Sequence, residues 1–170
     1  VQDSYRHVMD DLPLDCSHLY LAIDGVLAAV ICISDPLRQE AQEVIDGLKH
    51  AGFDNIVMMT GDSRRTADSI ALQVGIDKYY AEVLPEDKAK FVQSQRDNGR
   101  TVVMVGDGIN DSPALSAANA GIAISEGAAI AREIADITVA ADDLRELVRL
   151  KYLSTAMMKR INKNYRAIMG

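Results

Sequence analysis

The sequence predicts an α/β fold built around a parallel, doubly wound sheet. After residue 52, short β-prone apolar runs alternate with segments of helical periodicity, and the connections between them are short. The composition agrees with this class, because 170 residues with 48% hydrophobic side chains suffice for one domain with a sizeable core.

The individual elements follow from local patterns. Residues 19–23 and 26–33 are β-prone runs, and the Asp24-Gly25 pair between them is a strong signal for a hairpin turn. Helical spacing or a helix-compatible stretch after a strand predicts helices at residues 37–51, 63–74, 86–96, 112–118 and 127–135. Short apolar runs between them predict strands at residues 56–59, 79–81, 101–105, 121–124 and 137–139.

A long amphipathic segment, residues 142–169, follows the alternating elements. Its apolar residues recur every three or four positions, and lysines and arginines cover the other faces. Two interpretations stay open: a long surface helix, or a juxtamembrane helix whose basic residues face anionic headgroups. The chain as a whole is acidic, with a net charge of −7, so nucleic acid is not an expected partner.

The cysteines and the chain ends bear on cellular context. Cys16 and Cys32 form no CxxC pair, and we expect two reduced thiols that make no metal-ligand cluster with His7, His18 or His50. Without a signal peptide or an apolar run of about 18 residues, we expect a cytosolic chain. The chain lacks an initiator methionine and stops within an amphipathic stretch, which suggests a fragment of something larger.

The most informative loop follows a predicted buried strand and holds two carboxylates and an amide on a glycine-rich turn. Its residues are Gly106, Asp107, Gly108, Asn110 and Asp111. Parallel α/β sheets bind ligands at the carboxyl ends of their strands, and carboxylates four apart suit a hard cation such as Mg²⁺. A calcium-binding EF-hand does not fit, because the twelfth position counted from Asp107 is Ala118 rather than glutamate.

Two further loops follow predicted strands and would converge on the same edge. Thr60, Gly61 and Asp62 precede a helix N-terminus, where a hydroxyl and backbone N–H groups form an anion cradle. Pro85 suits a helix start, and Lys88 lies one turn inside, able to reach back to a phosphate. Each loop alone is an ordinary turn or helix start, but together they supply the parts that stabilise a transferring phosphoryl group.

This order of motifs resembles the haloacid-dehalogenase superfamily and, in detail, the heavy-metal-transporting branch of the P-type ATPases. The matching segments are Asp35-Pro36-Leu37-Arg38, Met59-Thr60-Gly61-Asp62, Ala81-Glu82-Val83-Leu84-Pro85-Glu86-Asp87-Lys88, Val103 to Leu115, Gly121-Ile122-Ala123-Ile124 and Ala135-Asp136-Ile137. The resemblance runs from about Leu19 to Gly170 and implies a Rossmann-like, haloacid-dehalogenase-like fold. It also implies an ATP-driven heavy-metal cation pump that forms an aspartyl phosphate.

The resemblance implies a role for each central residue. Thr60 and Gly61 would bind phosphoryl oxygens, and Lys88 would neutralise charge on the phosphate and the leaving group. Asp107 would ligate Mg²⁺ together with Asp111, which would also orient the phosphorylated side chain.

The resemblance gives the remaining residues supporting roles. Asn110 would help to position the metal and its waters, and Asp62 would lie near the nucleotide and the hinge. Cofactor-binding roles are further implied for Asp35, Arg38, Gly106 and Gly108. Along the chain, residues 1–34 would end the nucleotide-binding domain, 35–145 would form the phosphorylation-domain core, and 146–170 would be a basic juxtamembrane helix.

The chain departs from the family pattern in what it lacks. The Asp-Lys-Thr-Gly-Thr motif with the phosphorylated aspartate is absent, as are most of the nucleotide-binding domain and the membrane helices. ATP would therefore be bound mainly outside this chain. The absent motif also forms the family's central strand, so the isolated chain would have a gap at its core unless another strand fills it.

Two other interpretations use the residues differently. Leu21 to Leu27 resembles the first motif of small superfamily phosphatases, with Asp24 as general acid and Ala22 in the place of the nucleophile. A receiver-like module would bind Mg²⁺ without turnover and would need Asp35 as its phosphorylated residue.

The pump interpretation sets the expectations for partners and location. The partners would be the remaining domains and membrane helices of the same pump and its heavy-metal cation. The chain would lie on the cytosolic side of an integral membrane protein. The sequence does not identify the ion, the direction of transport or the oligomeric state.

Overall fold

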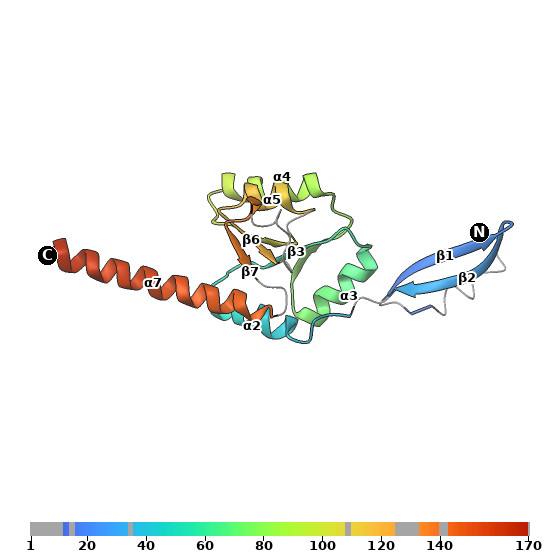
Figure 1. Ribbon diagram of the computed structural model, residues 1–170, viewed down its shortest axis with the longest axis horizontal. Coiled ribbons are helices and arrows are strands. Elements are labelled where there is room, and N and C mark those ends of the chain that lie inside the picture. Colours follow the sequence, from blue (N-terminus) through green and yellow to red (C-terminus); the bar gives the residue numbers. More distant parts are fainter. Residues whose placement is uncertain are drawn as a thin grey trace.

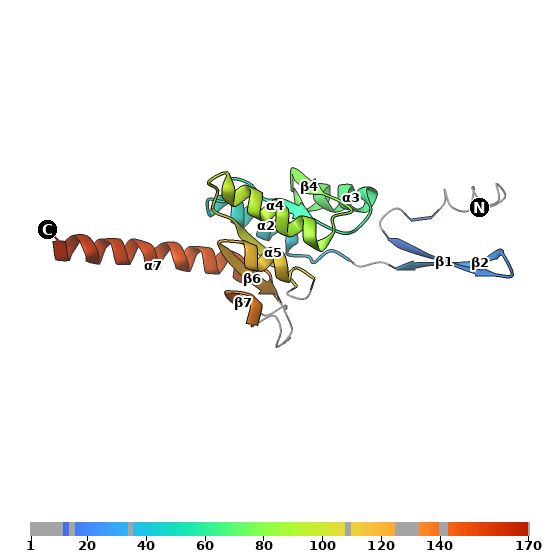
Figure 2. The same cartoon turned by 90° about the horizontal axis from the view of Figure 1, so that it is seen from above.

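The computed structural model describes residues 12–13, 16–33, 36–107, 110–124, 133–139 and 143–169. In chain order the elements are β1 (Ser17–Ile23), β2 (Val26–Ile33), α2 (Ala41–His50), β3 (Val57–Met59), α3 (Arg64–Val74), β4 (Lys78–Tyr80), α4 (Pro85–Asp97), β5 (Val103–Gly106), α5 (Ser112–Ala117), β6 (Ala120–Ile124), β7 (Ile137–Val139) and α7 (Arg145–Met169). Figure 1 shows an α/β core with the β1–β2 hairpin projecting from one end and α7 from the other, and Figure 2 shows the same arrangement from above.

The core strands are parallel, as the sequence predicts, but they form two separate hydrogen-bonded groups. β5, β6 and β7 make a three-stranded sheet in that order, and β3 pairs with β4. Among the described residues no strand pairs with both β3 and β5. This break is the one expected from the absent motif.

Helices cover both faces of the parallel strands. α4 and α5 lie on one face, while α2, α3 and the start of α7 lie on the other (Figure 1). Alternation along each strand explains the two layers, because successive side chains point to opposite faces. In β6, Ala123 packs with Val92 and Leu115 on the first face, and Ile122 packs with Val44 and Leu147 on the second.

Two glycines allow close packing between layers. A Cβ at Gly121 would lie 2.7 Å from the backbone oxygen of Leu115, so β6 approaches the end of α5 as closely as a glycine permits. A Cβ at Gly47 of α2 would lie 3.0 Å from Cγ2 of Val148, where α2 packs against α7.

The expected hairpin is confirmed, with an irregularity that the sequence did not indicate. Asp24 and Gly25 both have positive φ, 49° and 79°, which suits the primed turns that join tightly paired strands. The register pairs Ile23 with Val26 and Ala22 with Leu27, but Leu21 pairs with Ala29. One extra residue in β2 therefore forms a β-bulge and shifts every later pair by one position.

The helix boundaries differ from the expected ones at a few ends. The segment 37–40 is not helical: the amide of Ala41 bonds the oxygen of Arg38 in a turn, and α-helical bonding starts with Val44 to Glu40. Most of the expected helix 127–135 lies outside the described residues. In the described chain, no helix is both long and apolar enough to span a membrane.

Candidate functional site

The three motif-bearing loops follow β3, β4 and β5. In a parallel sheet the carboxyl ends of the strands face one edge, where ligands bind. Thr60 to Asp62 follows β3, the start of α4 follows β4, and Asp107 follows β5 directly. The local sequence explains each helix start: Ser63 caps α3 through its side chain, and Pro85 begins α4 where its missing N–H costs nothing.

Lys88 and Asp111 form the central contact of this region. The Lys88 ammonium nitrogen lies 2.8 Å from Oδ1 of Asp111, and their side chains are only 14% and 13% exposed. Lys88 projects from the first turn of α4, and Asp111 is the N-cap residue of α5. The starts of α4 and α5 thus bring together a cation and a carboxylate that are 23 residues apart in the sequence.

Gly106 provides the space that Asp111 occupies. A Cβ at position 106 would lie 2.5 Å from Oδ2 and 2.6 Å from Cβ of Asp111, closer than real side-chain contacts come. Gly106 therefore acts through close approach of the backbone to the site rather than through a side chain of its own.

Asp107 and Asn110 form a second local unit beside this pair. The backbone N–H of Asn110 donates to Oδ1 of Asp107 at 3.2 Å, and its side-chain amide donates to Oδ2 at 3.4 Å. Both residues are exposed. The carboxylate is thereby oriented by its own loop while one side faces solvent.

Thr60 and Asp62 are also linked. The hydroxyl of Thr60 donates to Oδ2 of Asp62 at 2.6 Å, and the backbone N–H of Asp62 donates back to that hydroxyl oxygen at 3.1 Å. Beside them Gly61 is exposed, and a Cβ there would have only the oxygen of Val83 within contact, at 3.9 Å. The turn thus presents a hydroxyl and an open backbone to solvent.

Backbone hydrogen bonds tie the β3 loop to the segment that leads into α4. The N–H of Val83 donates to the oxygen of Thr60, and the N–H of Glu82 donates to the oxygen of Asp62, each at 2.9 Å. Glu82 adopts a φ of +56°, which is uncommon for a residue with a side chain. The Thr60 turn and the helix that carries Lys88 are therefore held together as one unit.

The structure places the other expected residues as follows. Asp35 and Gly108 lie outside the described residues. Arg38 precedes α2 and lies 3.8 Å from Glu40. Asp24, the general acid of the phosphatase interpretation, occupies the turn of an antiparallel hairpin far from the parallel strands (Figure 1). That position does not support the phosphatase interpretation.

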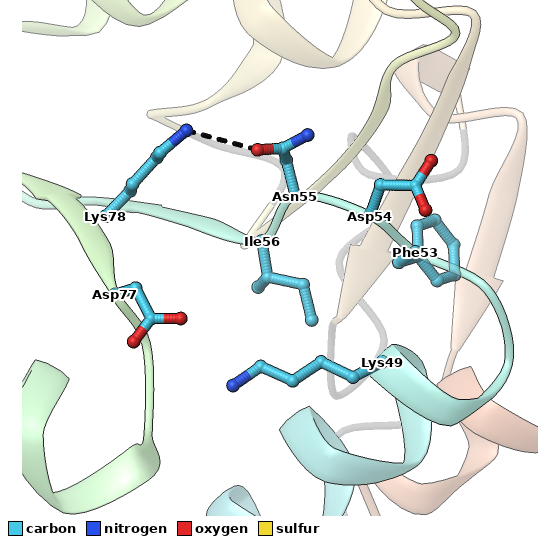
Figure 3. Close-up of a pocket in the computed structure, with 7 residues that line it drawn as sticks. All are labelled: Lys49, Phe53, Asp54, Asn55, Ile56, Asp77 and Lys78. Carbon is cyan, nitrogen blue, oxygen red and sulfur yellow. Dashed lines mark hydrogen bonds between the residues drawn. The ribbon is translucent and has the colours of Figure 1, made fainter.

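The hollow shown in Figure 3 lies elsewhere. Its volume is about 330 Å³, and its lining residues are Lys49, Phe53, Asp54, Asn55, Ile56, Asp77 and Lys78. These residues precede β3 and β4, so the hollow opens at the amino edge of the sheet. Its lysines are engaged in hydrogen bonds, Lys49 with the oxygen of Gly75 and Lys78 with Asn55.

The expectation of no cluster between cysteine and histidine is wrong. Ligand atoms of Cys16, His18 and Cys32 all lie within 4.8 Å of one another. The β1–β2 register places His18 opposite Cys32. A simple hairpin register counted from the Asp24-Gly25 turn would have placed His18 opposite Ile31 instead, so the only signal in the sequence, the turn itself, points to the wrong pair.

Comparison with known proteins identifies relatives of this arrangement. The family model described as haloacid dehalogenase-like hydrolase matches residues 3–119. The copper-transporting ATPase 2 of Homo sapiens is 46% identical over 146 residues, which cover 86% of this chain and 10% of that protein. The manganese-exporting P-type ATPase of Mycobacterium leprae is 44% identical over 148 residues, 86% of this chain and 20% of that one.

Solved structures agree with the sequence relatives. A zinc-transporting PIB-type ATPase in the E2.Pi state superposes with a TM-score of 0.78 at 33% identity, over 96% of this chain and 27% of that one. The chain thus spans a tenth to a fifth of the curated relatives named here. The resemblance to heavy-metal P-type ATPases and the α/β fold expected from it are confirmed.

Proposed function

Because this chain belongs to the haloacid dehalogenase-like hydrolases, we propose that it supplies the phosphate- and Mg²⁺-binding half of an aspartyl-phosphate site. The parent protein would be an ATP-driven pump for heavy-metal cations. Its relatives with names such as copper-transporting and manganese-exporting ATPase support this class, and no particular ion is favoured among them.

The ion pair between Lys88 and Asp111 is the observation that carries the proposal. Lys88 is largely shielded from solvent and lies beside a carboxylate at the ligand-binding edge of a parallel sheet. It is therefore positioned to bind an anionic substrate. Phosphoryl transfer needs little covalent chemistry from the protein and depends on positioned charge. In this role Lys88 would offset charge on the phosphoryl group while Asp111 holds its ammonium in place.

The β3 turn would bind the other phosphoryl oxygens. The Thr60 hydroxyl now donates to Asp62, and it can donate to a phosphoryl oxygen instead by rotating about one bond. The exposed backbone at Gly61 can contribute an N–H where no side chain obstructs the approach. Because this turn is hydrogen-bonded to the segment leading into α4, both groups would contact the same phosphate.

The residues present fit a magnesium ion. Asp107 and Asp111 follow β5 and offer hard carboxylate oxygens, and Mg²⁺ in phosphoryl-transfer sites is held by one or two carboxylates plus phosphate and water. We propose that these two residues hold the ion and that Asn110 orients Asp107. When bound, Mg²⁺ would neutralise negative charge on the transferring group.

The nucleophile would come from outside these residues. The break between β3 and β5 lies between the Thr60 turn and the Asp107 loop, where a further parallel strand would present its carboxyl end to both. We propose that a strand bearing the phosphorylated aspartate occupies this position, with ATP bound mainly by the nucleotide-binding domain. Arg38, Asp35 and Gly108 are proposed to lie near the cofactor, as expected from the resemblance.

The location follows from the same proposal. The chain would lie on the cytosolic side of a membrane protein, and α7 would be the basic helix that leads toward the membrane. Its exposed apolar residues, including Leu153 and Ile168, are 72% and 82% exposed in this structure and would be covered there.

Matched lysine variants test the proposal in the intact pump. We expect Lys88→Ala to reduce phosphoenzyme formation from labelled ATP by at least about 100-fold, because a charge-stabilising group at the transferring phosphate is removed. The matched control is Lys90→Ala on the same helix, which removes only an exposed ion pair with Asp87. Its phosphoenzyme level should stay near that of wild type. Near-normal phosphoenzyme in Lys88→Ala would contradict the proposal.

Aspartate variants test the metal site separately. Asp107→Asn should abolish turnover while leaving the fold intact, and its matched control Asp54→Asn alters an exposed carboxylate at the opposite edge. For the isolated chain we expect weak Mg²⁺ or phosphate-analogue binding and no sustained ATPase activity. Robust phosphatase turnover that is lost in Asp24→Asn would instead support the phosphatase interpretation.

A further inference from the structure

We propose that Cys16, His18 and Cys32 form a binding site for a thiophilic d¹⁰ metal ion, Cu(I) or Zn(II), at the base of the β1–β2 hairpin. Their candidate ligand atoms, two thiol sulfurs and an imidazole nitrogen, lie within 4.8 Å of one another. The site is separate from the carboxylates at the carboxyl edge of the parallel strands, and none of its residues belongs to the proposed phosphoryl-transfer machinery.

The hairpin backbone brings these residues together. His18 and Cys32 are directly paired across the two strands, and side chains of such pairs lie on one face of a sheet. Cys16 lies directly before β1, and its sulfur is within 4.8 Å of the ligand atoms of His18 and Cys32. All three ligands thus meet at the end of the hairpin opposite its turn.

The distance between the Cys16 sulfur and the His18 ring nitrogen is close to the one they would have around a bound ion. Sγ of Cys16 lies 3.4 Å from Nε2 of His18. Sulfur at about 2.3 Å and nitrogen at about 2.0 Å from a tetrahedral Zn²⁺ are separated by roughly 3.5 Å. The other pairs of ligand atoms lie within 4.8 Å, so closing the set around an ion requires side-chain movements of about 1 Å.

The donor types select the class of metal. Thiolates are soft ligands that prefer Cu(I) and Zn(II), and imidazole suits both metals, whereas Mg²⁺ requires hard oxygen ligands. Three protein donors match a three-coordinate Cu(I) site, or a Zn²⁺ site whose fourth position is taken by water. Cys16 is buried and Cys32 is exposed. One thiol is therefore shielded from solvent, and a metal ion can reach the site from the solvent side at Cys32.

A bound ion would also affect the hairpin itself. Isolated two-stranded hairpins are marginally stable in water, and most residues of β1 and β2 are exposed. A metal held by both strands would fasten the open end of the hairpin opposite the Asp24-Gly25 turn. Binding free energy would then appear partly as added hairpin stability.

Metal titration of the reduced 170-residue chain tests the site. We expect one Cu(I) or one Zn(II) per chain in separate titrations against a chromophoric chelator, without competition from excess Mg²⁺. The chain has two cysteines and both lie in the cluster, so any metal–thiolate absorption must come from this site. X-ray absorption would show two sulfur ligands and one imidazole, with a fourth light ligand only for Zn(II).

Variants decide whether these residues are the ligands. Cys32→Ser should weaken binding by more than roughly 100-fold, because loss of an outer-shell partner alone costs about 10–100-fold. Cys32 is exposed, so this variant stays folded even if Cys16→Ser does not. His18→Gln should weaken metal binding as well. The matched control is His50→Gln, which should leave metal binding unchanged, because His50 lies on α2 and its ring is hydrogen-bonded to the backbone oxygen of Asp46.

The proposal has independent ways to fail. Binding that is unchanged in Cys32→Ser, one ion shared by two chains, or a disulfide with no metal uptake under reducing conditions would each overturn it. The result is also separable from the phosphoryl-transfer proposal, because Lys88→Ala and Asp107→Asn should leave soft-metal binding unaffected. Slower amide exchange in β1 and β2 on metal addition would support it further.

Discussion

The hairpin and the parallel core bury their side chains very differently. In the core, Leu115 of α5 and Ala123 of β6 are 1% and 0% exposed and lie in one buried cluster with Val92 of α4. In the hairpin, Leu19 and Ile23 are 56% and 58% exposed although both are apolar. The two regions are therefore stabilised by different means.

The difference in burial separates a region stabilised by non-local packing from one stabilised by local structure. The core is stabilised by burial of apolar area contributed by residues far apart in sequence. The hairpin depends on its turn and cross-strand hydrogen bonds, and its exposed apolar residues are available for another layer. We propose that this layer belongs to a nucleotide-binding domain of which residues 1–34 are the end.

The largest effect should come from matched leucine truncations in the two regions. Leu115→Ala should lower the free energy of unfolding by about 2–5 kcal/mol, because it leaves a cavity between α5 and β6. Leu21→Ala, at a position 48% exposed, should change it by about 0.5 kcal/mol or less. Denaturant titration followed by circular dichroism measures both, and equal losses would show that the hairpin is as well packed as the core.

Glycine substitutions should give a smaller and more local contrast. Gly121→Ala should lower the free energy of unfolding by about 1–3 kcal/mol, because the added Cβ would lie 2.7 Å from the backbone oxygen of Leu115. Gly25→Ala has open space around it, but its φ of +79° is strained for alanine by about 1–2 kcal/mol. Amide exchange should locate the second loss in β1 and β2 only; spread into β5 or β6 would mean that the hairpin and core unfold together.

The smallest effect concerns the start of α7. A side-chain hydrogen bond from Arg145, and one from its backbone, hold the pKa of Asp143 below its ordinary value of 3.8. A lowered folded-state pKa contributes stability above the unfolded-state value, and this contribution is lost as pH falls through the folded-state value. The free energy of unfolding, measured by denaturant titration, should therefore be slightly higher for wild type than for Asp143→Asn at neutral pH. This difference should vanish in acid. A difference that persists to about pH 1–2 would exclude this ion pair as its origin.

Most elements could be predicted because their signals are local. Ser63 caps α3 and Pro85 starts α4 at the expected places, and β7 has the expected bounds. The start of α2 could not be predicted, because apolar spacing before residue 41 resembles helix while the backbone there makes a turn. The candidate site was named by residue from its motifs, but the pairing of Lys88 with Asp111 needed the packing of α4 beside α5.

The sequence by itself determined the order of strands and helices, the glycine and carboxylate loops at the strand ends, and the family. These depend on periodicity and on motifs within a few residues of one another. The absent motif also predicted the break that separates β3 from β5. Only the tertiary structure decided that Lys88 faces Asp111, because that contact depends on how α4 packs beside α5. It also decided that one bulge in β2 moves Cys32 opposite His18, because a one-residue shift in register exchanges the two faces of a strand.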